Sequence, residues 1–229
     1  TWHQVAVKKI KEVIKKGKTA IVVGGTGLYF KVLMEGLSKI PEVPKLDLNL
    51  NFKERLRLRS SYSLIYPEIF KGIAENDKQR LYRAISVYEH TGMALWEWYE
   101  KKNKKKYFKF DEFTKIVLNP PKLVLEDRIK KRFDQMLKEG AIKEVENFKK
   151  LKVDHIQSAN FIIGINEISD FLNQKITINE LKERVLIRSR QYAKRQYTWL
   201  RGQMKEWKGF ADINYLDLRK KTLSYLSKT

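Results

Sequence analysis

Several residue types and patterns are scarce in this sequence, and each absence excludes a class of protein. The 229 residues contain no cysteine, which rules out disulfide bonds and zinc sites built from thiolates. The three histidines, His3, His90 and His155, are far apart in sequence and lack the spacing of metal ligands. No apolar run approaches the roughly 18–20 residues that a membrane-spanning helix needs. The opening residues, TWHQVAVKKIKEV, predict an amphipathic helix rather than a signal peptide, so we expect a cytoplasmic protein.

Negative charge is also scarce. Lys+Arg 48 against Asp+Glu 27 gives a formal net charge of +21. Such an excess points to a polyanionic partner, with nucleic acid first and an anionic membrane surface second. A genome that places lysine wherever a solvated residue is needed would produce the same lysine count. The placement of the arginines therefore has to separate these interpretations.

Hydrophobic periodicity predicts an α/β fold that is mostly helical. The first amphipathic helix ends at Gly17, and TAIVV (19–23) predicts a short buried strand. A glycine turn and a helix over 28–35 follow. From 46 to 107 the strand signals vanish, and this interval is predicted to be a helical insertion.

The second half of the chain returns to a strand in FTKIVLNPP and then becomes strongly helical. Helices are predicted over 122–139, in AIKEVENFKKL and in SANFIIGINEISDFL. Thr177 and Glu180 have the spacing of a capping box at the start of a long helix that reaches about Met204. ADINYLDL predicts a late strand, and the last ten residues predict a weak helix.

The long helix, which contains RVLIRSRQYAKRQYTWLR, carries two stripes at helical spacing. The stripe predicted to be buried comprises Leu181, Val185, Tyr192 and Trp199. The other stripe consists of hydrogen-bond donors and comprises Arg190, Gln191, Lys194, Thr198 and Arg201. A basic face with almost no acid beside it repels itself unless phosphate neutralises it, and arginine offers bidentate donors that match phosphate. An ordinary solvated face is the alternative.

Three further segments show candidate chemistry. Arg128 and Arg132 lie four residues apart beside a core stripe, where they could stabilise an oligophosphate or form helix ion pairs with nearby acids. In NDKQRLYRAISVYEHTG, polar side chains follow an Asn-Asp helix cap, which fits either nucleic-acid contacts or a plain capped helix. In IVVGGTGLYF, the glycines could bring the backbone close to an anion or simply form a tight turn.

Four segments in the same order resemble the tRNA dimethylallyltransferase family, also called tRNA isopentenyltransferases. These are VVGGTGLYFKVLMEGLSKIP, NDKQRLYRAISVYEHTG, RIKKRFDQMLKEGAIKEV and RQYAKRQYTWLR, and they span nearly the whole chain. The resemblance implies transfer of a dimethylallyl group from dimethylallyl diphosphate, held with Mg²⁺, to the exocyclic amine of the adenine next to the tRNA anticodon. It also implies a P-loop NTPase-like core, here 1–45 and 108–229, with a helical insertion over 46–107 that grips the anticodon stem-loop.

The resemblance also implies roles for individual residues. Arg132 would be the catalytic arginine near the diphosphate, with Arg128 close by. The residues that would contact tRNA are Thr26, Gln79, Arg80, Arg83, Lys194, Arg195, Gln196, Thr198 and Arg201. The reacting base would have to leave its stack, as in other enzymes that modify a single base. We expect a monomer without a membrane partner.

Two motifs of the family are missing from these residues. There is no Walker A sequence, Gly-x-x-x-x-Gly-Lys-Ser/Thr, and no Asp-Ser pair whose aspartate would accept the proton from the amine. The chain therefore resembles the family without its N-terminal quarter or third, which would also hold the Mg²⁺ ligands. We expect these residues alone to bind tRNA weakly and to show little transferase activity. A non-catalytic RNA-binding module and a transferase acting on free adenine nucleotides stay open as alternatives.

Overall fold

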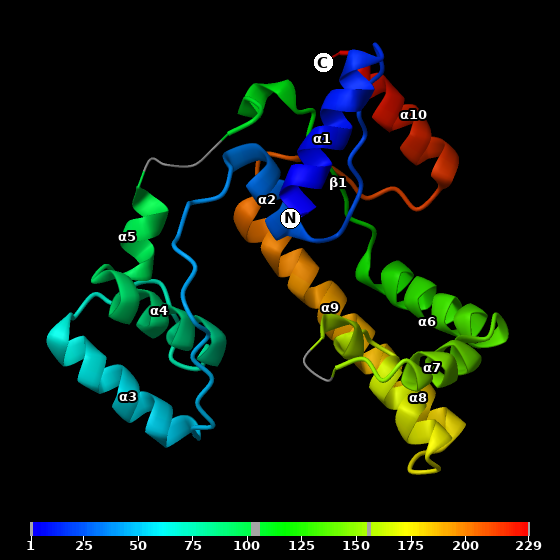
Figure 1. Ribbon diagram of the computed structural model, residues 1–229. Helices are drawn as coiled ribbons and strands as arrows, with labels where there is room; N and C mark the ends of the chain where they lie inside the picture. The colour runs from blue at the N-terminus through cyan, green and yellow to red at the C-terminus, as the bar shows by residue number, and fades with distance from the viewer. Residues whose placement is uncertain (1, 102–105, 155–156, 229) are drawn as a thin grey trace. The chain divides into compact units, whose positions relative to one another are not determined.

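The computed structural model describes residues 2–101, 106–154 and 157–228 (Figure 1). The predicted limits of the helical insertion, 46 and 107, are not tested by it and stay a prediction.

The chain forms two compact units. The first comprises Thr1–Val22 and Leu28–Glu112, and the second comprises Val23–Gly27 and Phe113–Thr229. The glycine turn is thus grouped with the second unit, although the chain on both sides of it belongs to the first.

Helices make up most of the first unit, and their ends follow local capping chemistry. They are α1 (Trp2–Lys15), α2 (Gly27–Glu35), α3 (Phe52–Ile65), α4 (Lys78–Thr91), α5 (Leu95–Glu100) and the short 3-10 helix η1 (Phe110–Glu112). Asn51 and Glu54 form a capping box at the start of α3. The Asp77 side chain accepts the backbone N–H of Arg80 at the start of α4. Gly92 ends α4 in the left-handed conformation, with φ of 66°.

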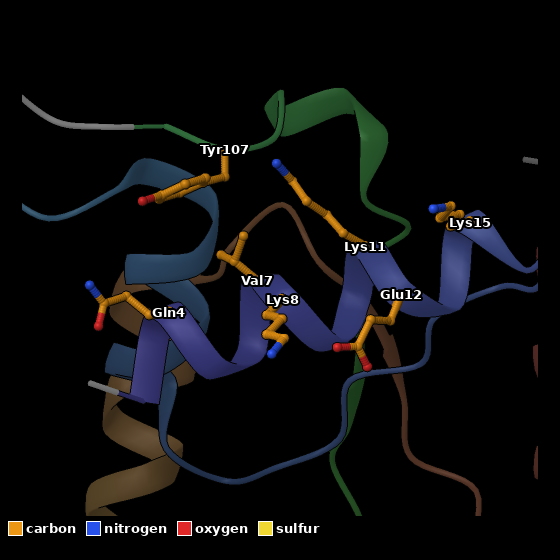
Figure 2. A pocket seen from close by; sticks show the side chains of 7 residues that line it. All are labelled: Gln4, Val7, Lys8, Lys11, Glu12, Lys15 and Tyr107. Carbon is orange, nitrogen blue, oxygen red and sulfur yellow. The ribbon is translucent and has the colours of Figure 1, made fainter.

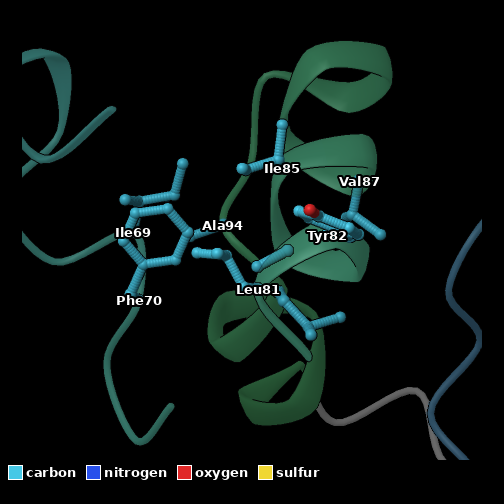
Figure 3. Close-up of a cluster of buried hydrophobic side chains, with 9 residues drawn as sticks. Ile69, Phe70, Leu81, Tyr82, Ile85, Val87 and Ala94 are labelled. Atoms are coloured by element: carbon cyan, nitrogen blue, oxygen red, sulfur yellow. The ribbon is translucent and has the colours of Figure 1, made fainter. Parts of the chain in front are cut away.

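The core of the first unit is built around α4 (Figure 3). Leu81 is 0% exposed, and Ile85 is also buried. The other buried members of this cluster are Ile69, Phe70, Tyr82, Ala84, Val87, Ala94 and Leu95. Most of these buried side chains belong to α4, so neighbouring segments of the first unit pack around this helix. Burial of each large apolar side chain contributes about 1.5–3 kcal/mol.

An extended segment before α3 supplies part of that cover. Residues 36–51 contain no helix or strand. Two side chains of α4 fix this segment, since the Tyr82 hydroxyl donates to the carbonyl of Leu48 over 2.7 Å and Ser86 donates to the carbonyl of Pro44. The half-buried side chains of Ile40 and Val43 pack against the same core. The segment is therefore ordered by α4 rather than by secondary structure of its own.

The second unit pairs a small sheet with a helical layer. Its elements are β1 (Ile116–Leu118), α6 (Lys122–Lys138), α7 (Ala141–Lys150), η2 (Ser158–Phe161), α8 (Ile165–Leu172), α9 (Ile178–Gln203), β2 (Lys208–Phe210) and α10 (Tyr215–Leu226). β1 and β2 are parallel, with Val117 opposite Gly209. α9 packs against α6 and α8 (Figure 1). The core between these helices comprises Phe133, Ala141, Val145, Ile168, Ile176, Leu181 and Val185. Within the described residues, no helix is both long and apolar enough to cross a membrane.

The predicted strand over 19–23 is wrong. These residues form no strand, and the side chains of Ile21 and Val23 are 82% and 89% exposed. A strand needs a hydrogen-bonding neighbour, and the only sheet in the described part of the chain is the β1–β2 pair. Residues 19–23 have the apolar pattern of a strand, but no strand among the described residues pairs with them.

Two later predictions also need correction. ADINYLDL is not a strand, because β2 ends at Phe210 and Asn214 caps α10 by accepting the N–H of Leu216 over 2.8 Å. SANFIIGINEISDFL is not one helix, since Gly164, with φ of 107°, separates η2 from α8. The predicted strand in FTKIVLNPP, the capping box at Thr177 and the long helix after it are confirmed.

Candidate functional site

The N-terminal half of α9 carries cations that are paired with acids. Lys182 lies 2.8 Å from a carboxylate oxygen of Asp134 on α6. Arg184 pairs with Asp170 on α8 over 3.6 Å. Arg188 pairs with Glu167, also on α8. Each of these three cations therefore forms an ion pair with an acid on a helix next to α9.

Glu167 is a buried acid that sequence reasoning missed. One of its carboxylate oxygens accepts the bond from Arg188, and the other accepts the backbone N–H of Gly164 over 2.9 Å. Burial acts to raise the pKa of Glu167, but these hydrogen bonds outweigh it and hold the pKa below its ordinary value. The sequence did carry a signal for this role, because Glu167 lies three residues after Gly164, the spacing of a capping box.

The C-terminal half of α9 differs from the first half. Its cations are exposed, and none has an acidic partner among the described residues; they are Arg190, Lys194, Arg195 and Arg201. Tyr192 was predicted to be buried, but it is 44% exposed. Tyr192 is exposed because the core formed with α6 and α8 ends at Val185, whereas Trp199, the last member of the stripe, is half-buried. The exposed Tyr192 ring lies 5.7 Å from the guanidinium of Arg195. A cationic surface without counter-charges is suited to a polyanion.

The two sides of this half-helix have different surroundings. Lys194, Thr198 and Arg201 lie on one side, and all three are exposed. At about 100° per residue, Gln196 and Trp199 lie on the opposite side. The Nε2 of Gln196 donates to the carbonyl of Gly25 over 3.0 Å, so the glycine turn rests on that opposite side.

Two further residues lie near the C-terminal half of α9: Thr26 in the glycine turn, and Tyr197 on α9 itself. Thr26 lies in the turn between Gly25 and Gly27 and is exposed. Tyr197 donates its hydroxyl to the carbonyl of Pro120, in the loop between β1 and α6. Burial raises the pKa of Tyr197, which keeps the hydroxyl protonated as a donor. Sequence reasoning did not single out Tyr197, and its spacing alone gives no signal for this contact.

Arg128 and Arg132 on α6 form no ion pair with the acidic residues beside them on this helix. Asp127 pairs with Lys131 over 2.8 Å, so the helix ion pair involves the lysine. The guanidinium of Arg128 donates to the carbonyl of Ile213 over 3.3 Å. Arg132 is exposed and has no ion pair or hydrogen bond within residues 2–101, 106–154 and 157–228. Of the two, Arg132 is thus available to an anionic ligand.

The remaining candidate residues lie on α4, in the first unit. Gln79 is exposed at the start of this helix. Arg80 lies 3.4 Å from the carboxylate of its own cap, Asp77. Arg83 donates to the carbonyl of Pro41 over 3.5 Å, a long hydrogen bond. These residues belong to a different unit from Thr26, Arg128, Arg132 and the α9 residues.

A cavity lies on α1 in the first unit (Figure 2). It has a volume of about 420 Å³ and is lined by Gln4, Val7, Lys8, Lys11, Glu12, Lys15 and Tyr107. The ammonium of Lys11 extends toward the Tyr107 ring, 5.6 Å from its centre. The cavity is open to solvent, and none of the candidate residues lines it.

Metal-binding side chains do not gather anywhere in the described part of the chain. No three His, Asp or Glu residues there lie together as a site for a metal ion. The described residues therefore offer no ligand set that fits the Mg²⁺ implied by the family resemblance, whose ligands were expected outside these residues.

Comparison with known proteins gives one consistent result. The family described as IPP transferase matches residues 1–203. A tRNA dimethylallyltransferase of Pelagibacter ubique is 39% identical over 216 residues, which cover 90% of this chain and 67% of that protein. A tRNA dimethylallyltransferase of Parvibaculum lavamentivorans is 34% identical over 98% of this chain and 72% of its own length.

Solved structures have the same fold. The full-length tRNA isopentenylpyrophosphate transferase of Bacillus halodurans superimposes with a TM-score of 0.64 at 24% identity, covering 99% of this chain and 71% of that one. A eukaryotic dimethylallyltransferase described as acting on tRNA gives a TM-score of 0.61 at 24% identity, over 87% of this chain and 51% of that one. At these identities the structures establish the fold alone.

Proposed function

The chain belongs to the IPP transferase family, and from this we propose that it transfers a dimethylallyl group from dimethylallyl diphosphate to the exocyclic amine of the adenine next to the tRNA anticodon. In this reaction a nitrogen–carbon bond forms while the carbon–oxygen bond to diphosphate breaks. The amine loses a proton and diphosphate leaves. The protein acts as a monomer on the anticodon stem-loop. The parallel pairing of β1 and β2 supports a P-loop NTPase-like core.

The observation that carries this proposal is the division of α9 into two halves. The cations of its N-terminal half are paired with acids, whereas those of its C-terminal half have no acidic partner in the described residues. A solvated lysine-rich surface would not separate its charges in this way. The unpaired cations match the phosphates of a tRNA backbone, and a free adenine nucleotide would need no surface of this length.

The residues contribute to the reaction by charge and position. Arg132, exposed and without a partner in the described part of the chain, stabilises the negative charge that develops on the departing diphosphate. Arg128 lies one turn earlier on the same helix and supports it. Thr26, Lys194, Arg195, Thr198 and Arg201 face tRNA, together with Gln79, Arg80 and Arg83 on α4. We assign no general base among residues 1–229, because they contain no Asp-Ser motif.

The test of the activity uses the full-length protein with labelled dimethylallyl diphosphate. We expect label to enter an anticodon stem-loop with adenine next to the anticodon. A matched stem-loop with hypoxanthine at that position has no exocyclic amine and should stay unlabelled. If neither becomes labelled while both bind in a salt-dependent way, the protein is an RNA-binding module instead.

The test of the surface compares two lysines of α9. Lys194→Ala should reduce the slope of log affinity against log salt by about one unit, since one phosphate contact is lost. Lys182→Ala is the matched control, because Lys182 is paired with Asp134 and should leave the slope unchanged. Equal slopes for both variants would make the C-terminal half of α9 an ordinary solvated face.

A further inference from the structure

The glycine turn contacts α9 across a sequence separation of 171 residues. Besides the hydrogen bond from Gln196 to the carbonyl of Gly25, the Trp199 ring lies against Gly27. A Cβ atom on Gly25 would lie 2.2 Å from the Nε2 of Gln196, and one on Gly27 would lie 2.0 Å from the Cδ1 of Trp199. A side chain at Gly25 would therefore require the end of the Gln196 side chain to move, and one at Gly27 would require the Trp199 ring to move.

These two glycines therefore serve a different purpose from others in the chain. Gly92 and Gly140 have positive φ angles, and a Cβ on either would meet nothing within 4 Å. Gly25 and Gly27 are absent from the positive-φ residues, so their backbone would accept a side chain. The side chains of Gln196 and Trp199 on α9, rather than the backbone conformation of the turn, leave no free space for a Cβ atom there.

Gln196 and its contact with the turn lie on the side of α9 opposite Lys194, the residue proposed to face tRNA. Gln196 lies about 200° around α9 from Lys194. Its Nε2 donates one hydrogen bond to the turn. The indole N–H of Trp199 is buried without a hydrogen-bond partner among the described residues, so its ring acts through shape.

We propose that Gln196 and Trp199 are positioning residues that fix the Gly24–Gly27 turn, and with it Thr26, on α9, and that Gln196 does not contact tRNA. The role of Thr26 toward tRNA rests on the proposed function. The contact that fixes the turn on α9 does not depend on it. The proposal replaces the expectation that Gln196 is a tRNA ligand. It also gives the glycines a purpose other than binding phosphate.

Thermal melting of the full-length protein tests the fixing of the turn. Gly27→Ala should lower the melting temperature by about 4 °C, because the rigid Trp199 ring cannot move aside. The loss should largely disappear when Trp199→Leu is already present, since the smaller side chain leaves room. Gly25→Ala should cost less, because the end of the Gln196 side chain is flexible. Gly202→Ala on α9 is the control, since a Cβ there meets nothing within 4 Å.

Kinetics test the role of Gln196 in the reaction. Gln196→Met keeps the size of the side chain, adds no charge and removes the donor. We expect kcat to fall about tenfold, which corresponds to one lost hydrogen bond of moderate strength, while KM for the stem-loop and the salt slope stay unchanged. Thr26→Ala combined with Gln196→Met should be no slower than Thr26→Ala alone, because both act through the turn.

Two results would overturn the proposal. The first is a Gly27→Ala variant that melts like Gly202→Ala, which would show that Trp199 does not hold the turn. The second is a Gln196→Met variant that reduces the salt slope or raises KM, which would make Gln196 a tRNA contact. Absence of transfer in the unmodified protein would count against the proposed function alone, because the melting comparison needs no substrate.

Discussion

Arg188→Ala tests whether the buried ion pair holds α9 in place. The substitution leaves the Glu167 carboxylate, 6% exposed, with the N–H of Gly164 as its remaining strong partner. Removing one member of a fully buried pair costs about 3–5 kcal/mol. The side chain of Arg188 is 39% exposed, so water can replace part of the interaction. We therefore expect the free energy of unfolding to fall by about 2 kcal/mol.

The effect should depend on pH in a defined direction. The pKa of Glu167 is held below its ordinary value of 4.5, so the folded protein binds this proton less readily than the unfolded chain. The stabilisation is then fully present above pH 4.5 and is lost as the pH falls through the folded pKa. The difference in unfolding free energy between the unmodified protein and Arg188→Ala should narrow in acid.

Urea unfolding at pH 7 and below pH 4.5 measures both effects. Arg184→Ala is the control, because Arg184 is one turn away and pairs with Asp170 at the surface over 3.6 Å. Its cost should be about 0.5 kcal/mol. If Arg188→Ala and Arg184→Ala cost the same at pH 7, or if the cost of Arg188→Ala grows in acid, the reasoning about Glu167 is refuted.

Two further predictions concern the core and the reaction. Leu81→Ala should lower the free energy of unfolding by about 3 kcal/mol, because Leu81 is fully buried, whereas Leu64→Ala, at 87% exposed, should change it by less than about 0.5 kcal/mol in urea unfolding. Arg132→Ala should reduce kcat by about 100-fold and leave stem-loop affinity unchanged, while Lys131→Ala, whose lysine is paired with Asp127, should leave both unchanged. Loss of binding with turnover spared would contradict the role of Arg132.

The sequence by itself determined the features that depend on neighbours along the chain. The capping box at Thr177 and Glu180 predicts the start of α9, and both residues adopt it. Gly17 predicts the end of the first helix; α1 ends at Lys15, and Gly17 has a positive φ of 67°. Four co-linear motifs were enough to predict the family, because each keeps its own local spacing. These signals need no knowledge of the rest of the fold.

Only the tertiary structure decided what the residues of α9 contact. Lys182 and Lys194 are alike in sequence, but Asp134 on another helix pairs with one and no described acid pairs with the other. The residues of the glycine turn allow either an anion-binding loop or a tight turn, and only the fold brings Gln196 and Trp199 against Gly25 and Gly27. Such contacts join residues far apart in the chain, so no local pattern carries them. The exposed apolar residues at 19–23 show the same point, since a strand exists only where another strand pairs with it.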